Sequence, residues 1–327
     1  MQAMVLSKIG EALEWTDLAD RHPAADEIRV HVGACGVCRT DLHVVDGDLP
    51  DPVLPIIPGH EIVGTIDEIG SAVRGLRVGD RVGVPWLGHT CGVCDYCLAH
   101  RENLCDRPLF TGYTRDGGFA TSTIVDARYA FALTSQGSDV GPAPLLCAGL
   151  IGWRSPVIAG EGKNLGLYGF GAAAHIVAQV AKWMGRRVVA FTRPGDIASQ
   201  AVAMSLGAAW AGGSDEQPPE PLAAAIIFAT DGNLVPSALK AVRKGGRVVC
   251  AGIHMSDVPS FPYSLLWEER QVVSVANLTR KDGLDFLRMA PEIGIVTRTT
   301  AYPLQQADQA MADLRAGRFE GAAVLVP

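Results

Sequence analysis

The spacing of hydrophobic and polar positions changes along the chain and divides it into three stretches. From residue 1 to about 148, apolar and polar residues alternate in short runs that glycine and proline interrupt, for example at 27–32, 62–69 and 81–84. A period of two residues is typical of strands with one buried face. We therefore expect this first stretch to form a barrel-like β domain.

The middle stretch, from about 149 to 277, alternates apolar strands with helical patterns. Strands are expected at 165–168, 187–192, 223–229 and 247–252, and helices at 172–184, 196–206 and 235–242. This alternation predicts a parallel sheet with right-handed crossovers. The tail, 278–327, is expected to hold one helix, at 305–316, and a terminal strand, at 322–326, while the acidic, proline-rich run 214–221 is expected to be a surface loop.

Length and charge narrow the class of protein. A chain of 327 residues is long enough for two domains of ordinary size. The net charge of −7, without a dense Lys/Arg stripe, gives no reason to expect a nucleic acid partner. No apolar run reaches the roughly 18 residues of a membrane span, and the first residues lack the pattern of a secretory signal. We expect a cytoplasmic protein, in which clustered cysteines favour metal binding over disulfides.

The turn after the first strand of the middle stretch carries the pattern G-x-G-x-x-A. Gly169 permits the tight turn, Gly171 lets the backbone approach a pyrophosphate, and Ala174 allows close packing of helix on strand. The helix that begins at Ala172 would present unpaired N–H groups and the positive end of its dipole to phosphates. Alone, the pattern also fits an ordinary strand–helix turn, but the flanking alternation favours a dinucleotide site.

The end of the second strand bears on the choice of cofactor. It reads Thr192-Arg193, where NAD sites usually carry a carboxylate that holds the ribose hydroxyls. Thr192 and Arg193 suit a 2′-phosphate, so we favour NADP(H), with NAD(H) as the alternative. The alternative interpretation is that Arg193 is a solvated loop residue or stacks on adenine. Ile253, after the strand at 247–252, is a further candidate for contact with the cofactor.

Six of the eight cysteines and one histidine form two candidate metal sites. Cys91, Cys94, Cys97 and Cys105 lie within fifteen residues, a spacing that lets four thiolates enclose one tetrahedral zinc ion. Iron–sulfur ligation uses similar spacings and is the alternative. Four protein ligands leave no place for a substrate, so we expect this site to be structural.

The second candidate set is scattered along the chain. Cys38, His60 and Cys147, with Glu61 beside His60, supply two thiolates and one imidazole and leave a fourth position open. Each of these residues taken singly is compatible with an ordinary buried role. We interpret the remaining two cysteines, Cys35 and Cys250, as ordinary buried residues.

In combination these segments resemble a known family. CGVCRTDLH, PGHE, the four-cysteine run, PLLCAG and GFGAAAH occur in the order typical of zinc-dependent medium-chain alcohol dehydrogenases, and the resemblance covers essentially the whole chain. It implies an α/β protein with a GroES-like β-barrel catalytic domain at 1–148 and 278–327, in which 91–105 form a structural zinc lobe. A Rossmann domain with a doubly wound parallel sheet would occupy 149–277.

The resemblance also implies roles for individual residues. Cys38, His60 and Cys147 would bind a catalytic zinc, with Glu61 as a transient ligand and Asp41 orienting His60. With the structural site, this gives two zinc ions per chain. A zinc-bound alcohol would lose its proton to Thr40 and, through the nicotinamide ribose, to His43. The alkoxide would then pass hydride to the nicotinamide, and reduction of an aldehyde would reverse the path.

The resemblance leaves two other functions open. One is a polyol or sugar-alcohol dehydrogenase on the same scaffold, and the other is a non-catalytic nucleotide-binding relative. In the leading interpretation the substrate is a small primary or secondary alcohol or the corresponding carbonyl compound. Members of the family are dimers or tetramers, so we also expect a homo-oligomer.

Overall fold

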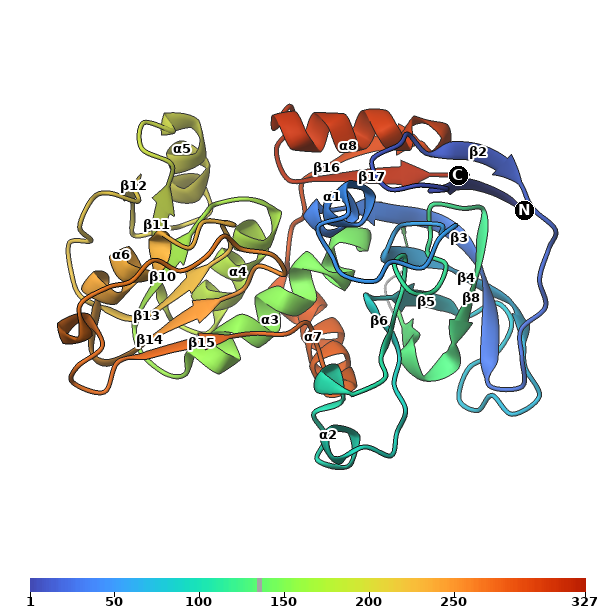
Figure 1. Cartoon of the computed structure of the whole chain (residues 1–327), viewed down its shortest axis with the longest axis horizontal. Helices are drawn as coiled ribbons and strands as arrows, with labels where there is room; N and C mark the ends of the chain where they lie inside the picture. Colours follow the sequence, from blue (N-terminus) through green and yellow to red (C-terminus); the bar gives the residue numbers. More distant parts are fainter. Residues whose placement is uncertain (134–136) are drawn as a thin grey trace. The chain divides into compact units, whose positions relative to one another are not determined.

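The computed structural model describes residues 1–133 and 137–327, and these form two compact units (Figure 1). Unit 1 comprises residues 1–150, 277–291 and 296–327, and unit 2 comprises residues 151–276 and 292–295. The expected domain limits at 148 and 278 lie close to these divisions. Residues 292–295 belong to unit 2, whereas the sequence analysis placed all of 278–327 in the other domain.

Unit 1 is built on a seven-stranded sheet with the order β16-β17-β3-β4-β5-β9, in which β8 also pairs with β3. These strands are β3 (Glu27–Val37), β4 (Glu61–Ile69), β5 (Arg81–Val84), β8 (Ser122–Asp126), β9 (Phe131–Ala132), β16 (Thr299–Pro303) and β17 (Ala322–Val326). Two small sheets pair β1 (Gln2–Val5) with β2 (Glu14–Asp17), and β6 (Leu87–His89) with β7 (Leu109–Phe110).

Alternation of side chains explains the core of unit 1. In β3, Ile28, Val30 and Val32 are buried on one face, where they join Ile62 and Ile66 of β4 in one hydrophobic cluster. Each such side chain stabilises the fold by about 1.5–3 kcal/mol relative to an exposed position. The expected β domain is therefore found where period-two alternation predicted it.

The helices of unit 1 include three that the sequence analysis did not predict, α1 (Arg39–Asp46), α2 (Asp95–Leu98) and α7 (Arg280–Ile293). The unit also contains α8 (Ala307–Ala316), with short 3-10 turns at Glu102–Leu104, Ala127–Tyr129, Ala143–Leu146 and Leu304–Gln306. The prediction of a single helix in the tail is wrong, because α7 precedes α8. Its buried residues Gly283, Phe286 and Ala290 have helical spacing, but Gly283 and Pro291 obscure the pattern.

Unit 2 contains a six-stranded parallel sheet with the order β12-β11-β10-β13-β14-β15. Its strands are β10 (Asn164–Tyr168), β11 (Arg187–Thr192), β12 (Trp210–Gly213), β13 (Leu222–Ile227), β14 (Val242–Cys250) and β15 (Gln271–Ser274). Numbered within the unit, this is the order 3-2-1-4-5-6 of the Rossmann fold. Residues 214–221 connect β12 to β13 as a loop, as expected.

The helices of unit 2 are α3 (Ala148–Ala159), whose first three residues belong to unit 1, α4 (Ala172–Trp183), α5 (Ile197–Ser205) and α6 (Leu234–Ala241), with a 3-10 turn at Tyr263–Leu265. Successive strand residues enter two different cores. Leu167 and Ala190 pack with α4, whereas Tyr168 and Phe191 pack with α6. The sheet is thus covered on both faces, and the predicted doubly wound α/β class is confirmed. Among the helices that the structure describes, none is both long and apolar enough for a membrane span.

Candidate metal and nucleotide sites

The N-terminus of α1 fixes Cys38 of the scattered set and the nearby Asp41. Cys38 is the N-cap residue, and its Sγ accepts a hydrogen bond from the backbone N–H of Thr40 at 3.3 Å. In return, Asp41 Oδ2 accepts a hydrogen bond from the backbone N–H of Cys38 at 2.8 Å. This reciprocal capping satisfies two N–H groups that a helix start otherwise leaves unpaired. The local sequence therefore sets both the Cys38 sulfur and the Asp41 carboxylate in place.

Asp41 also orients His60. The distance from His60 Nδ1 to Asp41 Oδ1 is 3.0 Å, and both side chains are fully buried. Because the carboxylate accepts a hydrogen bond from Nδ1–H, the lone pair of the imidazole lies on Nε2. Nε2 is 3.1 Å from Cys38 Sγ, so it faces the other members of the set. Trp86 contacts the same imidazole edge-on, with ring centroids 5.1 Å apart.

Glu61 and Cys147 complete the cluster. One ligand atom from each of Cys38, His60, Glu61 and Cys147 lies within 4.8 Å of the other three. Glu61 Oε2 is buried and has no hydrogen-bond partner. The glycine at position 36 leaves room for this carboxyl group, because a Cβ there would overlap Glu61 Oε2. Burial raises the pKa of the Glu61 carboxyl well above its ordinary value.

This donor set fits a divalent metal ion. Burying an unpaired carboxylate oxygen is costly unless a cation lies nearby. The sulfurs of Cys38 and Cys147 are 4.0 Å apart. Two sulfurs bound tetrahedrally to one zinc ion at 2.3 Å would be about 3.8 Å apart, close to the observed distance. With two sulfurs and one nitrogen as ligands, the site would keep a position for a substrate oxygen.

The four cysteines of the lobe form the second cluster. Their sulfurs all lie within 4.8 Å of one another, with Cys91 at 3.5 Å from Cys105 and at 4.0 Å from Cys97. Backbone N–H groups of Val93 and Cys94 lower the pKa of the Cys91 thiol to about 6, which favours the thiolate form that binds metal. Burial instead raises the pKa of Cys105 to about 11. Four sulfurs at these separations suit a closed tetrahedral site.

Thr40 and His43, the residues expected to relay the proton, both lie on α1. Thr40 lies in the first turn of α1, and His43 lies one turn further along the helix. His43 Nδ1 is 2.8 Å from Asp48 Oδ2, a contact that the sequence analysis did not foresee. The pair follows from the sequence HVVDGD, because Gly47 ends α1 in a left-handed conformation and returns the chain toward His43. Cys35 is buried in the core, as expected.

The glycine-rich turn lies between β10 and α4. Gly169 has a φ of +85°, and a Cβ there would crowd Ala229. Gly171 is the N-cap residue of α4, and a Cβ at that position would meet nothing within 4 Å. No side chain caps the helix start at Ala172, so its first N–H groups remain available to an anion. Ala174 is fully buried against the sheet.

Thr192 has surroundings that differ from the expectation. Its hydroxyl is hydrogen-bonded to the carbonyl oxygens of Arg193 and Gly212, at 3.0 and 3.3 Å, and accepts a hydrogen bond from Gln200 Nε2 at 3.2 Å. The residue is only 4% exposed. The hydroxyl therefore points into unit 2, and a bond to a 2′-phosphate would require these contacts to break. Arg193 is exposed, and Ile253 is half exposed.

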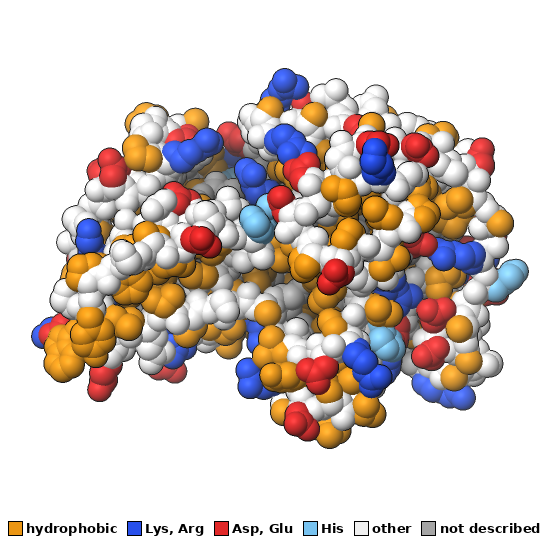
Figure 2. All heavy atoms as spheres, viewed as in Figure 1, with side chains coloured by type: hydrophobic (Ala, Val, Ile, Leu, Met, Phe, Trp, Pro, Cys, Tyr) orange, Lys and Arg blue, Asp and Glu red, His pale blue; other side chains and the backbone are white. Residues whose placement is uncertain are grey.

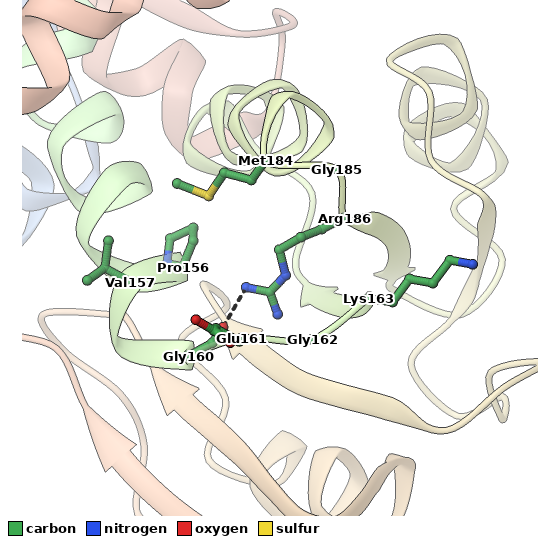
Figure 3. A pocket seen from close by; sticks show the side chains of 9 residues that line it. All are labelled: Pro156, Val157, Gly160, Glu161, Gly162, Lys163, Met184, Gly185 and Arg186. Atoms are coloured by element: carbon green, nitrogen blue, oxygen red, sulfur yellow. Dashed lines mark hydrogen bonds between the residues drawn. The ribbon is translucent and has the colours of Figure 1, made fainter.

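A hollow of about 460 Å³ in unit 2 lies away from the glycine-rich turn (Figure 3). Lys163 and Arg186, which line it, directly precede β10 and β11, so the hollow is at the amino ends of these strands. Doubly wound sheets bind their ligands at the carboxyl ends of the strands. The hollow is therefore not the expected nucleotide site. Arg186 Nη1 donates a hydrogen bond to the carbonyl oxygen of Gly160 at 3.1 Å.

Comparisons with known proteins agree with this architecture. The family model of the alcohol dehydrogenase GroES-like domain matches residues 24–135. A probable alcohol dehydrogenase, AdhA, of Mycobacterium tuberculosis is 50% identical over 313 residues, which are 93% of this chain and 90% of that protein. An alcohol dehydrogenase of Geobacillus stearothermophilus is 33% identical over 342 residues, 99% of each chain.

A solved structure is also similar over the whole chain. It is the cobalt- and zinc-bound thermostable alcohol dehydrogenase of Pyrobaculum aerophilum, with a TM-score of 0.91, 25% identity, and coverage of 100% of this chain and 99% of that one. The predicted combination of a GroES-like and a Rossmann domain is thereby confirmed. The chain belongs to the zinc-dependent medium-chain alcohol dehydrogenase family and is an alcohol oxidoreductase.

Proposed function

We propose that this enzyme interconverts a primary or secondary alcohol and its carbonyl compound, with NADP(H) as cofactor and with zinc in both metal clusters. The observation that carries the proposal is the buried group of Cys38, His60, Glu61 and Cys147, which includes a carboxyl oxygen without a partner. The cobalt and zinc named for the Pyrobaculum enzyme support the choice of metal. Zinc in the scattered site would act as a Lewis acid toward the substrate oxygen.

The protein's own residues would prepare and complete the proton transfer. Asp41 keeps His60 in the tautomer that presents Nε2 to the metal. The Thr40 hydroxyl would accept the proton of the substrate alcohol and hand it on toward His43. Asp48 accepts a hydrogen bond from His43 Nδ1, so Nε2 is the nitrogen that would take the relayed proton. Asp48 thus joins the relay residues that the resemblance implied.

Support for NADP(H) now rests on Arg193. No carboxylate follows β11 at the position that holds the ribose of NAD, and the exposed Arg193 guanidinium suits a 2′-phosphate. Thr192 contributes by fixing the backbone of this turn, since its hydroxyl bonds the carbonyl oxygen of Arg193. The uncapped start of α4 would bind the pyrophosphate. Ile253, just beyond the carboxyl end of β14, would contact the cofactor through its exposed side chain.

The cofactor proposal is tested with Arg193→Asp. Loss of a charge-assisted hydrogen bond costs about 1.5–3 kcal/mol, so kcat/KM with NADP+ should fall about 10- to 100-fold relative to NAD+. Arg187→Asp is the matched control, because Arg187 is an arginine at the opposite end of β11 that pairs with Glu220. An unchanged cofactor preference in Arg193→Asp would contradict the proposal. A panel of simple alcohols, aldehydes and polyols in the same assay separates an alcohol dehydrogenase from a polyol enzyme.

The metal proposal is tested by two cysteine variants. Cys38→Ser should lose turnover and one metal ion per chain while the protein stays folded. Cys94→Ser should lose the other ion and unfold more easily, because the lobe relies on its metal for structure. Metal content by mass spectrometry and thermal unfolding distinguish the two cases. Full activity of Cys38→Ser would refute the proposed metal role.

The expected homo-oligomer would form through the edge of the unit 2 sheet. β15 is the last strand of this sheet; Val272 within it is 38% exposed, and Trp267, which precedes it, is 60% exposed. Figure 2 shows apolar side chains gathered over the region of β14 and β15. An apolar edge strand of this kind pairs readily with a second copy. Val272→Lys should lower the mass measured by light scattering, whereas Leu98→Lys, on exposed α2 of unit 1, should not.

A further inference from the structure

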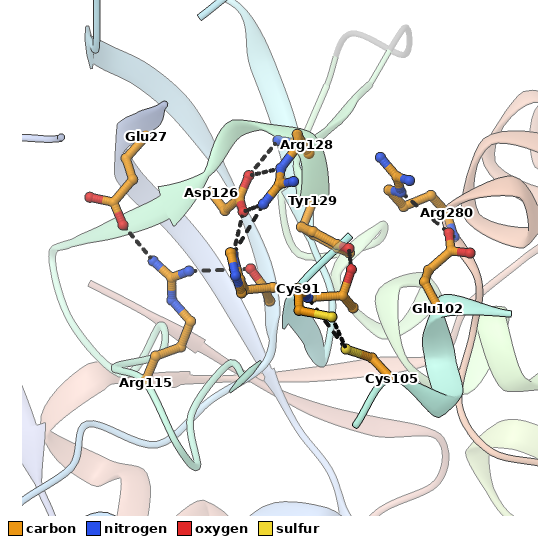
Figure 4. Close-up of polar contacts among 12 residues, drawn as sticks. Glu27, Cys91, Glu102, Cys105, Arg115, Asp126, Arg128, Tyr129 and Arg280 are labelled. Atoms are coloured by element: carbon orange, nitrogen blue, oxygen red, sulfur yellow. Dashed lines mark hydrogen bonds and ion pairs between the residues drawn. The ribbon is translucent and has the colours of Figure 1, made fainter. Parts of the chain in front are cut away.

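The four-cysteine lobe is tied to the start of α7 by one buried carboxylate (Figure 4). Glu102 lies between Cys97 and Cys105 and is only 6% exposed. Its Oε1 accepts hydrogen bonds from the backbone N–H and from Nε of Arg280, at 3.0 and 3.3 Å. Burial acts to raise the pKa of Glu102, but these hydrogen bonds outweigh it, so the pKa lies below its ordinary value. The group is thus a charged anchor at the positive end of the helix.

A second contact joins the other end of the lobe to the same arginine. Thr90, which precedes Cys91, has its Oγ1 2.5 Å from the hydroxyl oxygen of Tyr129. The Arg280 guanidinium carbon lies 5.6 Å from the centre of the Tyr129 ring, within the range of a cation–π contact. Both ends of the lobe are therefore linked to Arg280, one directly through Glu102 and the other through Tyr129. Arg280 is the first residue of α7.

Further along, side chains of α7 pack near residues that precede and follow Cys147 in the sequence. Phe286 is fully buried, and its ring occupies the space that a Cβ on Gly149 would need. Leu287 packs on the buried cluster that contains Leu146. Cys147 lies between these two contacts in the sequence. Because protein cores are close-packed, a shift of α7 is transmitted to this short segment.

We propose that Glu102 is a positioning residue for the catalytic metal site, because it fixes α7 and thereby the backbone that carries Cys147. The lobe then has a role beyond local stability, since it braces one ligand of the reactive metal. This inference rests on the proposed function, in which Cys38, His60 and Cys147 hold that metal.

Cobalt substitution tests the proposal without measuring turnover. The visible absorption of Co²⁺ reports its ligand geometry, and a Cys38→Ser background gives the absorption of the lobe alone. The difference between the two spectra belongs to the scattered site. It is recorded for the wild type, for Glu102→Ala and for Glu27→Ala, together with the rate at which a chelator removes the cobalt. Glu27→Ala is the matched control, because Glu27 likewise accepts hydrogen bonds from an arginine, Arg115 Nη2 at 3.1 Å, and from a backbone N–H, that of Ala24, and neither partner lies in α7.

Glu102→Ala should shift the difference spectrum and speed the loss of cobalt from the scattered site roughly tenfold, at the low end of the effect of residues that orient metal ligands. Glu27→Ala should match the wild type. Glu102→Gln keeps an oxygen acceptor for the Arg280 N–H but loses the charge, so it should lie between the wild type and Glu102→Ala. If the alanine variant does not fold, the glutamine variant decides.

Two results separate failure of this inference from failure of the proposed function. If the Glu102 variants change only the absorption of the lobe, or match Glu27→Ala, Glu102 acts on the lobe alone and the inference is overturned. If Cys38→Ser binds as much cobalt as the wild type, the proposed catalytic metal site itself is wrong.

Discussion

The Asp41→Asn substitution tests how strongly one buried carboxylate controls the metal site. Asp41 accepts two hydrogen bonds, from His60 Nδ1 and from the backbone N–H of Cys38. An asparagine side chain offers one acceptor oxygen and one amino group, which donates. If the oxygen keeps the Cys38 N–H, the amino group faces His60 Nδ1. The imidazole then has to accept at Nδ1 and carry its proton on Nε2, the nitrogen that faces Cys38 Sγ.

The magnitude follows from this exchange. A proton on Nε2 blocks metal binding, so binding requires either the other tautomer or a rotated amide. The first leaves two donors facing each other, and the second leaves a buried N–H of Cys38 unpaired, each at a cost of about 1–3 kcal/mol. We therefore expect metal affinity to fall about 10- to 100-fold, the range for partners that orient a ligating histidine.

Competition with a chromogenic chelator measures this affinity, and kcat with a simple alcohol should fall with metal occupancy. Asp126→Asn is the control, since Asp126 Oδ2 lies 2.7 Å from His89 Nδ1 and is equally buried, but is outside the scattered site. Retention of the catalytic metal within about twofold of wild type in Asp41→Asn would show that the carboxylate does not set the tautomer of His60.

Three further predictions concern packing, pH and burial of charge. Gly36→Ala should destabilise the fold by about 1–3 kcal/mol in urea unfolding, because its Cβ meets the Glu61 carboxyl. Glu61→Ala in the same chain should relieve only part of this loss, because the Glu61 Cβ would still lie 2.9 Å from the added Cβ. Burial acts to raise the pKa of Asp126, but contacts with Arg128 and His89 outweigh it and hold the pKa below its ordinary value of about 4. The carboxylate then stabilises the fold above about pH 4 and loses this effect on further acidification. The unfolding free energies of wild type and Asp126→Asn should therefore converge as the pH falls below about 4. A gap that widens on acidification would contradict a lowered pKa of Asp126. Arg186→Met should change the unfolding free energy by less than about 1 kcal/mol. The hydrogen bond from Arg186 to Gly160 is offset by two buried donors of the same side chain, Nε and Nη2, that have no partner. A decrease in the unfolding free energy of more than about 2 kcal/mol would show that the guanidinium is better satisfied than its contacts indicate.

Local periodicity was sufficient to predict the bounds of several elements of the fold. The strands expected at 81–84, 187–192 and 322–326 have the bounds of β5, β11 and β17, and α4 begins at Ala172 as expected. The strands β12 and β15 were not predicted, because each has only four residues and neither alternates: β12 reads WAGG and β15 reads QVVS. The helix α7 was missed because Gly283 and Pro291 interrupt its pattern, although its packing against Gly149 determines its course.

The candidate site shows a different limit of sequence reasoning. The types and order of the residues were sufficient to predict that Cys38, His60 and Cys147 belong to one site. The direction of a side chain, however, depends on the elements around it. Thr192 was expected to face a cofactor, yet it ends the buried strand β11, and its hydroxyl bonds the neighbouring strand at Gly212. Glu102 gave no signal at all, because its partner Arg280 is distant in the sequence.

The register between β3 and β4 explains how the scattered ligands meet. Cys38 follows the last residue of β3 and His60 precedes the first residue of β4, so this antiparallel pair brings both to the same end of the ladder. Burial alone does not select this register, because Ile62 and Val63 are buried on opposite faces of β4 and a slip by one residue would exchange two apolar side chains. The selection comes from Gly36, which pairs with Glu61. A slip would place Cys35 or Val37 opposite Glu61, and either Cβ would collide with the buried carboxyl that only glycine accommodates. The same glycine therefore sets the strand register and seats the carboxyl group of the metal site.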